Sequence, residues 1–212
     1  MKLMKREHAT LILEKSGKKL IVDPGSFTEP LPDASEAVAI VLTHAHADHW
    51  TPEHLSSILA ASPGIPIYAP EGVAEAASDF DVTVVKAGDE IVVEPFTLKF
   101  FGEKHAVIHS SIPVIDNVGV LVDDTLYYPG DSFTVPEGVE VDVLAVPVGA
   151  PWLKIGEVID YVLEVKPKRS FATHEMVLSS AGTSMGRDRI KWATEQGGGE
   201  SFVLAPGDSI EL

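Results

Sequence analysis

Cysteine is missing from this 212-residue sequence. Its absence excludes disulfides, thiolate metal sites and cysteine nucleophiles. Basic residues are also scarce, with 16 Lys and Arg against 32 Asp and Glu, which gives a net charge of −16. The electrostatic field of so negative a chain repels phosphate backbones, so we expect no broad nucleic-acid interface. It does not exclude a small anionic substrate, because a bound divalent cation would make its site locally positive.

Long apolar runs are absent as well. No stretch approaches the roughly 20 residues needed to cross a bilayer. Residues 1–8 contain charged side chains and lack the apolar core of a signal peptide. We therefore expect a cytoplasmic protein without membrane association. With 45% hydrophobic residues, mean hydropathy +0.14 and no linker or internal repeat, the sequence predicts a single domain over 1–212. The sequence leaves the oligomeric state open.

Short β-type runs and helical patterns alternate along the chain. Strands are predicted at 8–14, 18–22, 37–42, 65–68, 82–85, 90–93, 96–101, 118–122, 125–128, 141–146, 169–173, 202–204 and 209–212. Helices are predicted at 52–60, 71–78, 155–165 and 184–195. Each half of the chain thus contains hairpins and two helices. Two mixed sheets packed face to face, with the helices outside, would bury such strands on both sides, which is an α+β fold.

Three imidazoles and one carboxylate lie within six residues directly after the apolar run 37–42. His44 and His46 can converge from an extended chain, whereas Asp48 and His49 lie beyond the bend and can face a second point. Imidazole and carboxylate are ligands for zinc and other divalent first-row metals. The cluster therefore favours two adjacent ions over a polar loop that is merely rich in histidine. Residues 51–53 follow as a helix start.

Four further residues stand where a predicted strand meets a loop, which is where sites are usually assembled. They are Asp23, His105, Asp131 and His174. Each has a plainer alternative: Asp131 could be a turn residue after Pro-Gly, and His174 a core or capping histidine. His105 competes with His109, four residues further on, as the ligand from this part of the chain.

The stretch 44–49, His-Ala-His-Ala-Asp-His, resembles the HxHxDH signature of the metallo-β-lactamase superfamily. The four residues above follow in the order of that superfamily's other motifs. Pro-Gly-Asp-Ser at 129–132 and the run 146–152 look most similar to its small L-ascorbate-6-phosphate lactonase-like branch. The resemblance implies a four-layer αββα sandwich. It also implies a dinuclear metal-dependent hydrolase that attacks a small polar lactone, ester or phosphoester through a metal-bridging hydroxide.

The same resemblance implies roles for the individual residues. It places His44, His46 and His105 on the first metal, Asp48, His49 and His174 on the second, and Asp131 on both. Asp23 would not bind metal but would hydrogen-bond the ligand loop or an imidazole N–H, as carboxylates next to metal ligands do. Asp48 would also orient the hydroxide. Zn²⁺ is the expected metal, with Mn²⁺ or iron as alternatives that the same ligands suit.

The remaining candidates concern the substrate. His109 is a candidate acid for the leaving group, or else an outer-shell or surface residue. Trp152 and Lys154 are candidates for the pocket wall, against the alternatives of a core side chain and a solvated charge. His8 is expected to be an exposed strand residue, and His54 to face solvent.

Other functions stay open at this point. A nuclease is disfavoured by the charge and by the lack of room for an RNA-gripping arm. A true β-lactamase is disfavoured because those enzymes resemble secreted proteins and commonly carry a cysteine where Asp131 stands. A non-catalytic metal-binding module on the same fold is the alternative from another class. A diiron redox protein would need a flavin-binding domain that this chain lacks.

Overall fold

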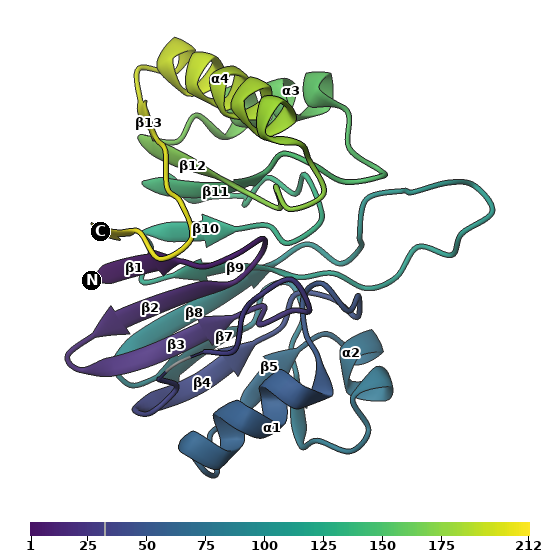
Figure 1. Ribbon diagram of the computed structural model, residues 1–212, viewed down its shortest axis with the longest axis vertical. Coiled ribbons are helices and arrows are strands. Elements are labelled where there is room, and N and C mark those ends of the chain that lie inside the picture. Colours follow the sequence, from purple (N-terminus) through teal and green to yellow (C-terminus); the bar gives the residue numbers. More distant parts are fainter. Residues whose placement is uncertain (32) are drawn as a thin grey trace.

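The computed structural model describes residues 1–31 and 33–212, and within them the chain forms two seven-stranded sheets and four helices (Figure 1). The order in the first sheet is β14 (Ser209–Glu211), β1 (Lys2–Lys5), β2 (Leu11–Lys15), β3 (Lys18–Val22), β4 (Ala37–Val41), β5 (Ile67–Ala69) and β6 (Val82–Val84). The order in the second is β13 (Glu200–Phe202), β12 (Arg169–Thr173), β11 (Val143–Pro147), β10 (Leu126–Tyr128), β9 (Gly119–Val122), β8 (Phe96–Phe101) and β7 (Glu90–Val93).

Both sheets are mixed. In the first sheet, the pairs from β14 to β3 are antiparallel and those from β3 to β6 are parallel. In the second sheet, the pairs from β7 to β10 are antiparallel and those from β10 to β13 are parallel. The parallel strands need crossover connections, and the helices supply several of them.

Three hydrophobic clusters define four layers. The central cluster joins the facing sides of the sheets, for example Leu13 and Val41 with Phe100 and Phe171. The two outer clusters lie beneath the helices: α1 (Pro52–Ala61) and α2 (Glu71–Ala76) cover the first sheet, and α3 (Ile155–Val165) and α4 (Ser180–Gln196) cover the second. Figure 1 shows the two helix pairs on opposite sides of the molecule. The expected αββα architecture is therefore confirmed.

The strand directions bring several loops to one rim. β3 and β4 run the same way, and so do β8, β10 and β12, as their pairings require. The residues that follow the ends of these strands therefore gather at one edge of the sandwich. β1 also runs with β3, since each pairs antiparallel with β2, so the turn after β1 reaches the same rim as the loop after β3.

The largest departure from the predicted elements is at the N-terminus. Residues 2–5 form β1, a strand that the sequence analysis did not predict, because Lys2, Lys5 and Arg6 mask its alternation. The strand predicted at 8–14 begins only at Leu11, and residues 6–10 form the turn between β1 and β2. β1 is nevertheless half buried, with Leu3 and Lys5 both fully enclosed between the layers.

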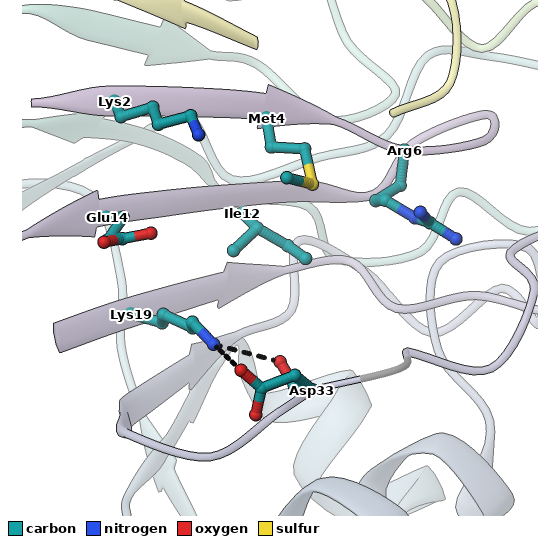
Figure 2. Close-up of a pocket in the computed structure, with 7 residues that line it drawn as sticks. All are labelled: Lys2, Met4, Arg6, Ile12, Glu14, Lys19 and Asp33. Atoms are coloured by element: carbon teal, nitrogen blue, oxygen red, sulfur yellow. Dashed lines mark hydrogen bonds and ion pairs between the residues drawn. The ribbon is translucent and has the colours of Figure 1, made fainter. Parts of the chain in front are cut away.

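The outer face of β1, β2 and β3 carries a groove of about 190 Å³, lined by Lys2, Met4, Arg6, Ile12, Glu14, Lys19 and Asp33. Figure 2 shows these side chains on one face, with Lys19 Nζ donating to the Asp33 carboxylate and carbonyl. None of the candidate metal ligands lines this groove. None of the helices in the described part of the chain combines the length and the hydrophobicity of a transmembrane segment.

Candidate metal centre

Hydrogen bonds hold the loop after β4, which contains residues 44–49, in a fixed shape. The Asp23 carboxylate accepts hydrogen bonds from the Thr43 backbone N–H at 2.8 Å and from the Thr43 hydroxyl at 2.6 Å. Further along, the His49 N–H donates to the His46 carbonyl at 3.0 Å, which closes the bend. Thr51 then caps α1 by accepting from the His54 N–H. The motif is thus fixed at both ends by side-chain oxygens that accept hydrogen bonds, and at its bend by one bond between backbone groups.

Two groups of side chains bring metal-ligating atoms to within 4.8 Å of one another. We call them the first half-site, made of His44, His46, His105 and Asp131, and the second half-site, made of His8, Asp48, His49 and His174. The structure therefore brings together all seven residues that the resemblance assigned to metals. It adds one, His8, that the sequence analysis did not assign.

Asp131 lies between the two half-sites. Its Oδ1 is 3.3 Å from His49 Nε2, and its Oδ2 is 3.2 Å from His174 Nε2 in the second half-site. The same Oδ2 is 3.4 Å from His105 Nε2 in the first half-site. Asp131 follows β10 and is 2% exposed, so it reaches the centre from a different sheet than His49. This is the placement that a bridging carboxylate requires.

The outer nitrogens of the imidazoles are held by neighbouring acceptors. His49 Nδ1 donates to Asp23 Oδ2 at 2.7 Å, and His174 Nδ1 donates to the Gly149 carbonyl. His105 Nδ1 donates to the Ala106 carbonyl. Each Nδ1–H bond fixes the tautomer in which Nε2 carries a lone pair directed at the centre. Asp23 thus has the outer-shell position that the sequence analysis proposed for it.

Several buried polar atoms at this point have no hydrogen-bond partner. They are His49 Nε2, His105 Nε2, Asp131 Oδ1 and His174 Nε2. An unpaired buried polar atom costs about 1–3 kcal/mol, and four of them here face one small region. Divalent cations would satisfy all of them at once, and nitrogen and carboxylate oxygen are suitable ligands for such ions. The donor set therefore fits a metal pair.

The charges of the two half-sites differ. Burial lowers the pKa of both His44 and His46, so these two imidazoles of the first half-site are neutral. Burial also opposes protonation of His174, but Asp131 outweighs it and raises the pKa of His174 to about 9. His49 behaves similarly, because Asp131 and Asp23 raise its pKa above the ordinary value despite burial. In the absence of metal, protons on His49 and His174 supply positive charge opposite the carboxylates of Asp23, Asp48 and Asp131.

Three residues at this rim have a strained backbone. His8, Asp23 and His174 have φ values of 58°, 47° and 61°. These values lie in the left-handed region, which residues other than glycine rarely adopt. Each such residue costs on the order of 1 kcal/mol and persists only where its surroundings hold it. All three belong to the centre or support it, and strain of this kind is typical of functional sites.

The expectation for His8 was wrong. It is not an exposed strand residue: it is 1% exposed and lies in the turn between β1 and β2. Its Nε2 is 3.1 Å from Asp48 Oδ2, and its ring centroid is 3.8 Å from that of His174. The missed signal was β1 itself, because a strand at 2–5 would have carried His8 to the rim where β3 and β4 end.

The remaining candidates separate clearly. His105 belongs to the first half-site, whereas His109 is exposed, belongs to neither half-site and has its Nδ1 hydrogen-bonded to Ser111. Trp152 is buried, and its Nε1–H donates to Asp131 Oδ2 at 3.0 Å. Lys154 is exposed and pairs with Glu157 at 3.4 Å.

An open cavity of about 450 Å³ lies beside the first half-site. It is lined by Ala106, Val107, Ile108, Phe133, Pro151, Trp152, Leu153, Lys154 and Glu157. Trp152 connects it to the centre, since its ring is edge-on to His105 at 5.7 Å between centroids. Apart from Lys154 and Glu157, the side chains that line it are apolar, but polar atoms form the larger part of its surface. A cavity of this size can hold a small ligand.

Fold and site together define a protein with two adjacent candidate metal-binding half-sites at the rim of an αββα sandwich. A family model described as "Beta-lactamase superfamily domain" matches residues 2–174. The chain therefore belongs to this superfamily, and its architecture is the metallo-β-lactamase fold. The narrower likeness to the L-ascorbate-6-phosphate lactonase-like branch stays a prediction.

Relatives and a solved structure are similar to this chain over most of its length. Protein Rv0786c of Mycobacterium tuberculosis is 37% identical over 185 residues, which cover 84% of this chain and 86% of that protein. UPF0173 protein PF0020 of Pyrococcus furiosus is 28% identical over 199 residues, covering 85% and 86%. The structure of Igni18, a metallo hydrolase from Ignicoccus hospitalis, matches 100% of this chain and 98% of its own, with a TM-score of 0.73 and 17% identity. That likeness concerns the fold alone.

Proposed function

We propose that this protein is a hydrolase that uses two divalent metal ions, one in each half-site, to cleave a small lactone, ester or phosphoester. The observation that carries the proposal is the set of four buried, unpartnered ligand atoms around Asp131. Zn²⁺ suits these ligands, and Mn²⁺ and iron are the alternatives. A metal pair would supply Lewis acidity and lower the pKa of water at the site.

The protein's own residues would orient the reactants. Asp48 Oδ2 is held by His8 at 3.1 Å and faces His174 Nε2 at 3.3 Å. This leaves Asp48 Oδ1 to accept a hydrogen bond from the attacking water and so to orient it. The side chain of Asp48 is 25% exposed, so it can contact both the centre and an incoming substrate. Trp152 would fix Asp131 through its Nε1–H bond.

The residues that line the cavity beside Trp152 indicate which part of a substrate would bind there. Its apolar side chains and mainly polar surface suit an uncharged substituent with polar groups on the acyl or leaving group. Lys154 extends into solvent and is already paired with Glu157, so we assign it at most a contact at the rim. His109 stays our candidate for the proton donor to the leaving group. The Ala variant of His109 should lower kcat and leave the metal content unchanged.

The test begins with metal analysis of the purified protein, where we expect about two ions per chain. The loaded protein is then assayed on esters, lactones, phosphodiesters, a β-lactam and a short RNA. Asp131→Asn should lose both metal and activity, whereas Asp160→Asn, an exposed change on α3, should keep both. Full metal occupancy with no activity on the panel would favour a non-catalytic metal-binding module. Activity that is independent of metal in Asp131→Asn would refute the proposal.

A further inference from the structure

The turn between β1 and β2, residues 6–10, makes contacts in the second half-site that no ligand motif predicts. It is closed by the Arg6 N–H, which donates to the Thr10 carbonyl at 2.9 Å. At its tip, His8 has a left-handed backbone and points its ring inward between Asp48 and His174. A histidine placed there could bind a metal directly or could hold the two ligands.

The hydrogen bonds of the ring distinguish these roles. The Met176 backbone N–H donates to His8 Nδ1 at 3.3 Å, so Nδ1 carries a lone pair and no proton. The proton of the neutral ring is then on Nε2, where it is donated to Asp48 Oδ2 at 3.1 Å. If Nε2 bound a metal instead, the proton would be on Nδ1 and would face the Met176 N–H, donor against donor. The contacts therefore favour a hydrogen-bond donor over a metal ligand.

His8 also connects residues that come from different sheets. Asp48 follows β4 of the first sheet, and His174 follows β12 of the second. The His174 N–H donates to the His8 carbonyl at 2.9 Å, and the two rings pack at 3.8 Å between centroids. One residue thus contacts one ligand from each sheet, through its backbone, its ring face and its Nε2–H.

A buried ion pair links the end of β1, directly before this turn, to the loop that contains His174. Lys5, the last residue of β1, is fully buried, and its Nζ lies 2.8 Å from Glu175 Oε1. Glu175 comes directly after His174 and also pairs with Arg187 at 3.2 Å. The pair restricts how far the loop at 174–176 can move away from His8.

We propose that His8 is a positioning residue of the second half-site: as the Nε2–H tautomer it orients Asp48 and His174 toward one metal without binding that metal itself. The inference rests on the proposed metal pair. It makes the turn at 6–10 a structural part of the centre. Outer-shell hydrogen bonds of this kind typically change metal affinity by about 10–100-fold.

The test uses the full chain with zinc as the probe. Zinc content and the two dissociation constants are measured by chelator competition for the wild type, His8→Ala, His8→Gln and His54→Ala. The His8→Ala variant should keep one tight zinc and bind the other about 10–100-fold more weakly. Glutamine can still donate a hydrogen bond to Asp48 but is a poor zinc ligand, so His8→Gln should recover most of that loss. His54 bonds the Thr28 carbonyl and belongs to neither half-site, so His54→Ala should bind zinc as the wild type does.

Circular dichroism in excess chelator tells weak binding from misfolding, and His8→Gln decides the question where His8→Ala does not fold. Two equally tight zinc ions in folded His8→Ala would overturn the inference. So would a folded His8→Gln that binds as weakly as His8→Ala, because a donated hydrogen bond would then not be the contribution of His8. Wild-type protein that binds no zinc would instead refute the proposed function, so the two failures are distinguishable.

Discussion

Gly25 provides a sharp test of how the ligand loop is supported. It lies directly against the backbone of that loop: a Cβ added there would be 1.8 Å from the Asp48 carbonyl oxygen and 2.5 Å from the His49 nitrogen. The oxygen would have to move by about 1.2 Å to reach the 3.0 Å that real Cβ contacts respect. The obstacle is backbone, so no side-chain rotation relieves it. In Gly25→Ala, the residues that carry two metal ligands must shift.

The size of the effect follows from this geometry. Overpacking a close-packed region costs about 1–3 kcal/mol, and a clash with backbone belongs at the upper end. For a chain of this length, each kcal/mol lowers Tm by about 2–4 °C. We therefore expect Gly25→Ala to unfold about 6–12 °C below the wild type in excess chelator. It should also bind the second zinc ion more weakly, because Asp48 and His49 both belong to the second half-site.

Gly156→Ala is the matched control. Gly156 lies in the first turn of α3, and a Cβ there meets nothing within 4 Å. Alanine in a helix is favoured over glycine by about 0.5–1 kcal/mol, so this variant should unfold slightly above the wild type and keep two zinc ions. Differential scanning calorimetry and metal analysis measure both results. If Gly25→Ala matched the wild type in Tm and zinc content, the close contact between Gly25 and the ligand loop would be refuted.

Three further predictions concern the centre and its supports. Trp152→Phe keeps the aromatic packing but removes the hydrogen bond to Asp131, so zinc affinity should fall by about 10–100-fold in calorimetric titration; unchanged affinity would contradict this role. Zinc added to metal-free protein at neutral pH should release protons, because the pKa of His174 is raised to about 9 and a ligand must be neutral. The zinc affinity of the second half-site should therefore rise with pH up to about 9. A zinc affinity that does not change with pH would contradict the raised pKa of His174. The same shift means that protonated His174 stabilises the metal-free fold below its unfolded pKa of about 6.5, and that this contribution is lost as pH rises through about 9. Lys5→Met leaves the buried Glu175 carboxylate with Arg187 alone and should lower the free energy of unfolding by about 3 kcal/mol in urea denaturation; a loss below the error of the method would contradict it.

The sequence predicted the order of most elements because their local patterns agree with their final environment. Runs such as 37–42 and 143–146 are continuously apolar, as strands buried on both faces must be. β1 was missed because its charged residues obscure the pattern. Lys5 belongs to the core only because Glu175, 170 positions further on, is its partner. A single strand has no local signal for such a pairing.

The candidate ligands divide in the same way. His44, His46, Asp48 and His49 are close in sequence, and their chemistry alone indicates a metal site. The association of Asp131 and His174 with them needed the superfamily motif, because spacing alone does not bring distant strand ends together. The prediction for His8 failed for the same reason.

The sequence by itself determined the apolar strands and the ligand types, because both depend on residues that are near neighbours in the chain. Only the tertiary structure decided which strand ends share a rim, and hence that His8 lies between Asp48 and His174. Strand direction and sheet pairing set that arrangement within each sheet. The packing of the two sheets then brings together residues more than a hundred positions apart, such as Asp48 and His174.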